Sequence, residues 1–258
     1  MAHSMTINCI SDLHCRKHRR PEDLPQDEIH WYGFDPSKLE PADVLVVAGD
    51  LGENYSYPFI KEELERLPQF KHVICIRGNH DYWGIGRENL PEENEVRFID
   101  NVAFICTPLW TPIPMSANEH PLYNDIMWYV HDCMNDFRYI SGWTLDVQNE
   151  QYHANLDFIK KSMEDAKAAG QKTVIVTHSV PRKDLIDEKY QDSLLNWAFH
   201  VMDGSCDDIK PDLWLCGHAH NYDNRELYGV RYVRNPIGYR WGMQELPSDH
   251  WYNTVLEV

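Results

Sequence analysis

The chain has 258 residues, of which 41 are acidic and 24 basic, so its formal net charge at pH 7 is −17. This balance disfavours a platform for long duplex nucleic acid, which needs clustered lysine and arginine to release counterions. No apolar run approaches the roughly 20 residues that cross a bilayer, and the N-terminus lacks the apolar segment of a signal peptide, so we expect no membrane partner.

The cysteines indicate a reducing compartment. There are seven, an odd number without a C-x-x-C pair, which is typical of free thiols. Cys9, Cys75, Cys106 and Cys216 fall in strand-like apolar runs, where a thiol behaves as a small core residue. We therefore expect a cytoplasmic protein. Residues 1–4, which precede Met5, are interpreted as a vector-derived remnant.

The first half of the chain alternates strand-like and helix-like segments, as in βαβ units. Strands are predicted at Thr6–Ile10, 44–48 and 72–76. A helix is predicted at 58–67, because charged and apolar residues lie on opposite sides and Pro68 follows.

Further strands and one long helix are predicted in the remaining sequence. The runs 96–99 and Val102–Cys106 flank an Asp-Asn pair that favours a hairpin turn. A helix at 149–169 ends at Gly170, where a left-handed residue closes many helices. The later strands are predicted at 173–177, Leu213–Cys216, 225–228, 230–233 and 251–257.

Residues 107–144 have no clear period and are rich in Pro, Trp, Tyr and His. Loops of this length are uncommon in a compact domain unless they have a function. We interpret the segment as a cap or substrate-recognition insertion, in which 126–133 supplies a helix.

Five polar clusters each follow one of the strand-like runs. They are Asp12-Leu13-His14, Gly49-Asp50, Gly78-Asn79-His80-Asp81, His178 and Gly217-His218-Ala219-His220. Strand ends of open α/β sheets carry side chains into a shared crevice, and carboxylates, imidazoles and an amide together suit first-row divalent cations. Because the clusters are spread along the chain and must meet in one place, we predict one domain, residues 5–258.

Together the clusters resemble the calcineurin-like metallophosphoesterase superfamily, whose order is D-x-H, G-D, G-N-H-[DE], a lone His and G-H-x-H. All five blocks occur in that order between Asp12 and His220. The first block alone is a weak signal, whereas five ordered blocks at strand ends are a strong one. The resemblance implies an α/β fold, a four-layer α/β/β/α sandwich of two mixed sheets flanked by helices.

The resemblance also implies two divalent metal ions per chain, and Mn²⁺, Fe and Zn²⁺ all fit the donor set. One ion would be held by Asp12, His14 and His220 and the other by Asn79, His178 and His218, with Asp50 bridging them. Cys15, beside His14, is an alternative soft ligand, although the set is complete without it.

Two catalytic residues are implied in the same way. His80 would protonate the leaving group or donate to a phosphate oxygen, and Glu53 would orient it. The family's phosphoprotein phosphatases carry Asp at the place of Glu53 and Arg at the place of Asn54. These departures favour the bacterial and phage type that acts on small phosphomonoesters or phosphodiesters. The stretches 177–181 (Thr-His-Ser-Val-Pro) and 235–239 (Asn-Pro-Ile-Gly-Tyr) also resemble that branch.

Other residues near the blocks have two interpretations each. Asp81 is expected to cap a helix or loop. Arg138, in an Asn-Asp-Phe-Arg stretch that similar chains carry, is either a substrate contact or a partner in a surface salt bridge. The basic run 16–20 is either a solvated loop or a positive rim that attracts phosphate.

The implied activity is hydrolysis of a small phosphorylated substrate, in which a metal-bridging hydroxide attacks the phosphorus in line. One alternative is a catalytically silent interaction module of the same fold. Another is a nuclease acting on short nucleic acid, in which aromatic side chains stack on bases instead of joining the core: Trp110, Tyr123, Trp128 and Tyr129. Six histidines outside the blocks are expected to lie outside the site: His72, His120, His131, His153, His200 and His250.

Overall fold

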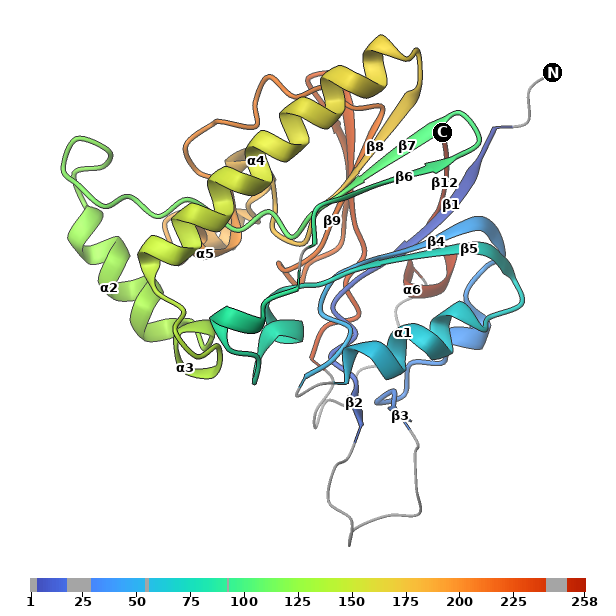
Figure 1. The fold of residues 1–258 in the computed structure, drawn as a ribbon, viewed down its shortest axis with the longest axis horizontal. Helices are drawn as coiled ribbons and strands as arrows, with labels where there is room; N and C mark the ends of the chain where they lie inside the picture. Colours follow the sequence, from blue (N-terminus) through green and yellow to red (C-terminus); the bar gives the residue numbers. More distant parts are fainter. Residues whose placement is uncertain (1–3, 18–28, 54–55, 92, 240–249) are drawn as a thin grey trace, which may run out of the picture.

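Two β-sheets lie between layers of helices in the computed structural model, which describes residues 4–17, 29–53, 56–91, 93–239 and 250–258 (Figure 1). Residues 1–3 of the expected remnant, residues 18–20 of the basic run and Asn54 lie outside the described residues.

The first sheet has four strands in the order β12-β1-β4-β5. Its parallel strands are β1 (Thr6–Ile10), β4 (Ala42–Ala48) and β5 (Phe70–Ile76). The edge strand β12 (Val255–Glu257) runs antiparallel to β1, so the sheet is mixed.

The second sheet has six strands in the order β10-β11-β9-β8-β7-β6. Four inner strands run parallel, and an antiparallel strand closes each edge. The inner strands are β7 (Val102–Cys106), β8 (Lys172–Val176), β9 (Leu213–Cys216) and β11 (Val230–Arg234), and the edges are β6 (Glu95–Ile99) and β10 (Asp223–Leu227). A short ribbon of β2 (Arg16–Lys17) and β3 (Ile29–His30) stands apart from both sheets.

Apolar side chains fill three interfaces between these layers. Alternate residues of the two sheets, such as Val46 and Val174, pack against each other in the centre. The long helix α4 (Leu145–Ala168) covers the outer face of the second sheet, and α1 (Tyr57–Glu65) covers that of the first. The predicted four-layer α/β/β/α sandwich of mixed sheets is therefore confirmed.

The segment 107–144 leaves the second sheet at the carboxyl end of β7. It contains α2 (Tyr123–Cys133) and α3 (Asp136–Tyr139), and α2 packs against the short helix α5 (Asn196–Phe199). The predicted helix at 126–133 lies within α2. Of the aromatic residues with two interpretations, Trp110 is buried in the core, whereas Trp128 and Tyr129 are exposed and do not join it.

Two predicted boundaries differ from the structure for local reasons. The helix predicted at 149–169 begins at Leu145, because Thr144 accepts a hydrogen bond from the amide of Val147 and caps it. The strand predicted at 251–257 is wrong in its first half, where α6 (His250–Asn253) precedes β12. The Thr254 hydroxyl donates to the carbonyl of His250 at the end of α6.

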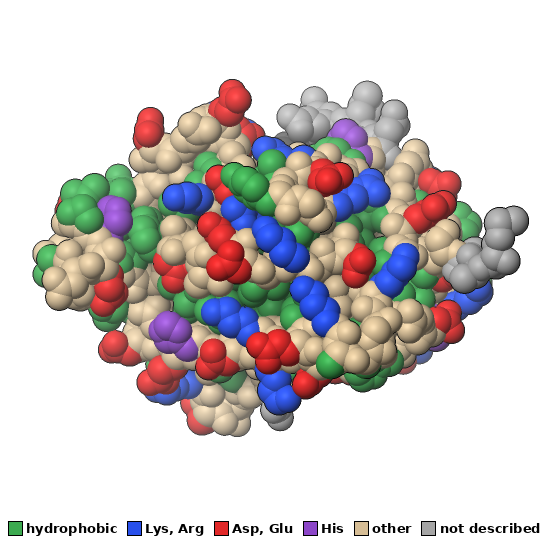
Figure 2. Space-filling model, turned by 90° about the horizontal axis from the view of Figure 1, so that it is seen from above, with side chains coloured by type: hydrophobic (Ala, Val, Ile, Leu, Met, Phe, Trp, Pro, Cys, Tyr) green, Lys and Arg blue, Asp and Glu red, His purple; other side chains and the backbone are tan. Residues whose placement is uncertain are grey.

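The described helices include none whose length and apolar character would let it cross a bilayer. Figure 2 shows one face of the molecule, on which Lys and Arg side chains are interspersed with Asp and Glu.

Candidate metal centre

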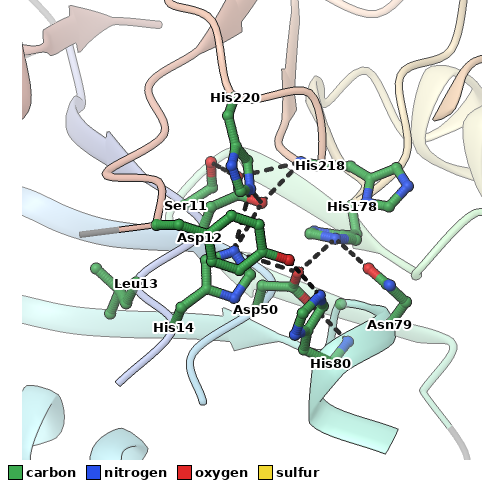
Figure 3. Close-up of polar contacts among 12 residues, drawn as sticks. Ser11, Asp12, Leu13, His14, Asp50, Asn79, His80, His178, His218 and His220 are labelled. Atoms are coloured by element: carbon green, nitrogen blue, oxygen red, sulfur yellow. Dashed lines mark hydrogen bonds and ion pairs between the residues drawn. The ribbon is translucent and has the colours of Figure 1, made fainter. Parts of the chain in front are cut away.

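The seven predicted ligand residues meet at one edge of the sandwich (Figure 3). Asp12 and His14 follow β1, Asp50 follows β4, Asn79 follows β5, His178 follows β8, and His218 and His220 follow β9. Because these strands are parallel within their sheets, their carboxyl ends lie at a common edge and deliver the side chains into one space.

One cluster consists of Asp12, His14 and His220. The Nε2 atoms of the two histidines are 3.1 Å apart, and Nε2 of His220 lies 3.3 Å from Oδ1 of Asp12. Ligands about 2.0–2.2 Å from a metal ion lie roughly 3.0–3.5 Å apart in octahedral or tetrahedral geometry. These two separations lie in that range, and Nε2 of His14 is 4.0 Å from Oδ1 of Asp12, so the three side chains surround a space close to that of one divalent ion.

A second cluster consists of Asp50, His178 and His218. Nε2 of His178 lies 3.4 Å from Oδ2 of Asp50 and 3.1 Å from Oδ1 of Asn79. The same Oδ2 of Asp50 is 3.8 Å from Nε2 of His14 in the first cluster. Asp50 therefore faces both clusters with one oxygen.

Hydrogen bonds from outside the centre determine which ligand atoms face inward. Nδ1 of His178 donates to the carbonyl of Ala48 (2.8 Å), which leaves Nε2 for a metal. Nε2 of His218 donates to the carbonyl of Ala198 (3.3 Å), which leaves Nδ1. Such outer partners fix both the tautomer and the orientation of an imidazole.

Asp136 orients the amide of Asn79 in the same way, and sequence reasoning missed it. Its Oδ1 accepts from Nδ2 of Asn79 (2.9 Å) and from Nε1 of Trp83 (2.8 Å), so Oδ1 of Asn79 points inward. Burial raises the pKa of Asp136. The available signal was the Asn-Asp-Phe-Arg stretch, from which Arg138 was selected instead.

Arg138 itself lies on the surface. Its guanidinium donates to the carbonyl of Asp132 (2.7 Å) and lies 4.0 Å from that residue's carboxylate. Among the described residues that line the cavity beside the centre, Arg138 does not appear. The geometry fits the surface salt bridge rather than the substrate contact.

Four site residues have left-handed backbone conformations that non-glycine residues rarely adopt. The φ angles are 55° at Asp12, 45° at His14, 55° at Asp50 and 66° at His218. Such conformations cost about 1–3 kcal/mol each and persist where the surrounding structure enforces them, commonly at functional sites.

The glycines at positions 49, 78 and 217 of the blocks have different roles. Gly49 has a φ of +89°, as a tight strand-to-loop turn requires, but Gly78 has a φ of −100°. A Cβ atom on Gly78 would overlap Oδ1 of Asp50 and the ring of His178, and one on Gly217 would lie 2.7 Å from the carbonyl oxygen of Ala48. Close approach of the ligand-bearing loops, rather than an unusual backbone, therefore requires glycine at 78 and 217.

His80 lies beside the two clusters with both ring nitrogens engaged. Nδ1 is 3.2 Å from Oε1 of Glu53, the partner predicted for it, and the ring stacks on Trp83. Burial would lower the pKa of His80, but the carboxylates of Asp50 and Glu53 outweigh this and raise the pKa. The arrangement favours the protonated imidazole.

Tyr239 is a second residue that sequence reasoning left without a role. Its hydroxyl lies 2.8 Å from Nε2 of His80, and its ring stacks on His14. The amides of Ile237 and Gly238 donate to the carbonyls of Ser11 and Asp12, which fixes this loop over the centre. The Asn-Pro-Ile-Gly-Tyr stretch was the available signal.

Asp81 and Cys15 are structural rather than ligating. The Asp81 carboxylate accepts hydrogen bonds from the amides of Leu51, Gly52 and Gly78, so it caps two site loops as expected. Cys15 is buried, its thiol faces the carbonyl of Leu13, and burial raises its pKa. A protonated thiol in that position is not the soft ligand considered as an alternative.

The centre combines ionised carboxylates with imidazoles in different protonation states. Burial opposes ionisation of Asp12 and Asp50, but neighbouring imidazoles outweigh it and hold the pKa of both carboxyls below the usual range. Burial lowers the pKa of His14 to about 3, so this imidazole is neutral and able to ligate. The two carboxylates and His14 are thus in the forms that bind a divalent cation. Burial would lower the pKa of His178, but the Asp50 carboxylate outweighs this and raises it to about 10, so a metal ion at His178 would displace a proton.

A cavity of about 470 Å³ opens beside the centre. Its floor includes Asn79, His80 and His218, and its walls come from residues 133–135 and 186–200. Only one edge of the cavity thus belongs to the segment predicted as a cap. His200, expected to lie outside the site, lines this cavity, although it belongs to neither cluster.

Comparison with known proteins identifies the family. The profile of the calcineurin-like phosphoesterases matches residues 5–222. The chain belongs to this family. Membership and the Asp/His clusters together support a metal-binding hydrolase of phosphate esters.

Two relatives show how far the likeness of this calcineurin-like phosphoesterase extends. An uncharacterized protein of Acanthamoeba polyphaga mimivirus is 25% identical over 246 residues, which cover 78% of this chain and 81% of that protein. The crystal structure of phosphopantetheinyl hydrolase from Mycobacterium tuberculosis superposes with a TM-score of 0.64 at 19% identity. It covers 98% of this chain and 95% of the other, and at that identity the likeness shows the fold alone.

Proposed function

We propose that the chain is a dinuclear metal-dependent hydrolase of small phosphomonoesters or phosphodiesters. The observation that carries this proposal is the position of Asp50, whose Oδ2 lies 3.8 Å from Nε2 of His14 and 3.4 Å from Nε2 of His178. A carboxylate between two ligand clusters is suited to bridging two ions.

The proposed ligands divide between two ions. Asp12, His14 and His220 would hold one, Asn79, His178 and His218 would hold the other, and Asp50 would be shared. When bound, the two divalent ions would neutralise the phosphate oxygens and make hydroxide available at neutral pH. Two carboxylates and four neutral imidazoles leave net positive charge at the loaded centre, which attracts an anionic ester.

His80 is proposed to donate a proton to the leaving oxygen. Nδ1 donates to Glu53, which keeps Nε2 directed toward the centre and favours the charged ring. The hydroxyl of Tyr239 lies 2.8 Å from Nε2. An ester oxygen that replaces this hydroxyl would meet a donor that is already aligned.

Replacement of His80 tests this role. His80→Ala should keep both metal ions and lower kcat by about 10²–10⁴-fold on a substrate with a poor leaving group. Elemental analysis measures the metal content, and steady-state kinetics measure kcat. An unchanged kcat on an alkyl ester would exclude proton donation by His80.

The function itself is tested by metal-dependent turnover. We expect the protein loaded with Mn²⁺, Fe²⁺ or Zn²⁺ to hydrolyse chromogenic phosphate monoesters or diesters, and Asp50→Asn to lose at least one ion together with that activity. Full metal occupancy in Asp50→Asn would contradict the bridging role. A lack of turnover with every metal would favour the catalytically silent interaction module.

The substrates to be screened are small. The cavity beside the centre is of the size that binds small molecules. The activity in the name of the Mycobacterium tuberculosis relative adds phosphopantetheinyl esters to nucleotides, phosphosugars and simple diesters in that screen.

A further inference from the structure

The walls of the cavity beside the metal centre are not needed by the proposed chemistry. Above the floor of metal-ligating side chains, they come from the turn between α2 and α3 and from residues 186–200 after β8. Both segments leave the second sheet at the edge where the ligand clusters lie. The cavity is therefore continuous with the place where a phosphate would bind.

Much of the wall is apolar. Trp83 stands beside His80 at the floor, and further apolar side chains extend away from it: Met134, Ile186, Leu195 and Phe199. Neutral polar groups of Asn135, Ser193 and Asn196 lie between them. Such a lining binds an organic group by burial of apolar surface and orients it by a few hydrogen bonds.

The wall has no net charge. Among the described residues that line the cavity above its floor, the charged side chains are Lys189 and Asp187. Their Nζ and Oδ2 atoms are 3.6 Å apart, and Nζ of Lys189 also lies 4.8 Å from the centre of the Tyr190 ring. A second anionic group of a substrate would have to compete with Asp187 for the one cation.

We propose that this cavity is a subsite for an uncharged, partly apolar organic group of the phosphate ester, several carbon atoms long. The proposal rests on the proposed function and specifies its substrate class. The volume of about 470 Å³ lies in the range of small-molecule sites. Because the wall has no net charge, esters that carry further phosphates or a charged terminus should be poorer substrates.

Cys133 provides a readout that does not depend on turnover. It lines the cavity and is exposed, whereas the other six cysteines are buried. A ligand in the cavity should therefore slow alkylation of Cys133 by N-ethylmaleimide, followed by intact mass, with Cys133→Ser as the control for the site of modification.

The experiment uses n-alkylphosphonates and Mn²⁺-loaded protein. Protection of Cys133 and inhibition of ester hydrolysis should strengthen about two- to fourfold for each added methylene from methyl- to hexylphosphonate, because each buried methylene contributes to affinity. A carboxylate at the far end of the chain should remove most of that gain. Equal binding of methyl- and hexylphosphonate would overturn the subsite.

A matched pair of variants locates the effect. Ser193→Trp fills the cavity from its exposed wall and should reduce the gain in phosphonate affinity per added methylene. Asp192→Trp changes an exposed neighbour outside the lining and should leave that gain in affinity unchanged. Equal gains in the two variants would also overturn the subsite. If esters are hydrolysed at rates that do not depend on chain length, the subsite proposal is wrong and the proposed function stands. If no ester is hydrolysed and no phosphonate binds, the proposed function fails and the subsite with it.

Discussion

The side chains of the candidate centre are held in place by residues outside the two clusters. The carbonyls of Ala48 and Ala198 select the inward nitrogens of His178 and His218, and Asp136 selects the oxygen of Asn79. Left-handed backbone at Asp12 and Asp50 places their carboxylates in the same space. The orientation of these side chains therefore depends on hydrogen bonds from outside the clusters and on the loop backbone. A single substitution can alter either of them.

Removal of Asp136 tests the first of these effects. Asp136→Ala frees the amide of Asn79 to rotate, so affinity for divalent metal should fall about 10–100-fold, the usual effect of removing an outer partner. Asp136→Asn keeps an acceptor oxygen and should recover most of the affinity. Competition with a chromogenic chelator measures it, and Asp132→Ala, on the exposed end of α2, is the control. Equal affinity in Asp136→Ala and the unmodified protein would exclude the orienting role.

The Glu53–His80 pair makes a prediction about pH. A general acid acts only when protonated, so activity is lost as pH rises through the pKa of His80. The Glu53 carboxylate raises that pKa, and Glu53→Gln removes this contribution. The alkaline limb of the kcat profile should therefore move to lower pH, with kcat at the acidic end of the plateau less affected.

The matched control for this pair is Glu62→Gln, an exposed carboxylate of α1 that pairs with Arg66. Its profile should coincide with that of the unmodified protein. A profile of Glu53→Gln that also coincides would show that Glu53 does not set the protonation of His80.

At the scale of elements, the strands deliver the site and the helices support the strands. The long helix α4 packs Tyr152, Leu156, Ile159 and Met163 against the outer face of the second sheet. Its first turn is stabilised by Thr144, whose hydroxyl oxygen accepts from the amide of Val147 (3.2 Å). A helix N-terminus without such an acceptor leaves its amides unpaired.

The cap of α4 is accessible to a stability measurement. Thr144→Ala should lower the free energy of unfolding by about 1 kcal/mol, because the amide of Val147 loses its partner. Thr144→Ser keeps the hydroxyl and should lie within a few tenths of a kcal/mol of the unmodified protein. Urea unfolding at constant metal concentration measures both, and equal losses in the two variants would show that the hydroxyl does not cap the helix.

For the whole molecule, the centre joins the two sheets. Asp12, Asp50 and Asn79 come from the first sheet, whereas His178, His218 and His220 come from the second. Ions bound between them would stabilise only the folded arrangement of both sheets, so metal binding and folding would be linked.

Metal removal should therefore lower the melting temperature. At an ion concentration 100-fold above its Kd, each bound ion contributes about 2.7 kcal/mol, and a chain of this size gains about 2–4 °C per kcal/mol. Chelation followed by calorimetry should show a decrease of roughly 5–10 °C per ion lost, reversed by Mn²⁺. Asp50→Asn should show a smaller decrease, and a melting temperature independent of metal would contradict the site.

The sequence by itself determined the blocks and most strand positions, and the resemblance that the blocks carry implied the layer architecture. Strand runs such as Leu213–Cys216 are short, apolar and bounded by turn residues, and the polar block follows where the run ends. Because parallel strands share an edge, the order of the blocks was enough to predict that their side chains meet. Local pattern failed at 251–257, where apolar and aromatic residues fit a helical turn as well as a strand.

Only the tertiary structure decided which other residues join the site. Long-range contacts bring in Asp136, Tyr239 and the wall at 186–200. The local sequence around each of them does not indicate which distant residues it contacts. The same holds for Gly78. Glycine is required at this position because Asp50 and His178, which follow other strands, leave no room for a Cβ atom. Residue type and spacing specify what a side chain can bind, but orientation, burial and neighbours arise from packing between segments distant in sequence.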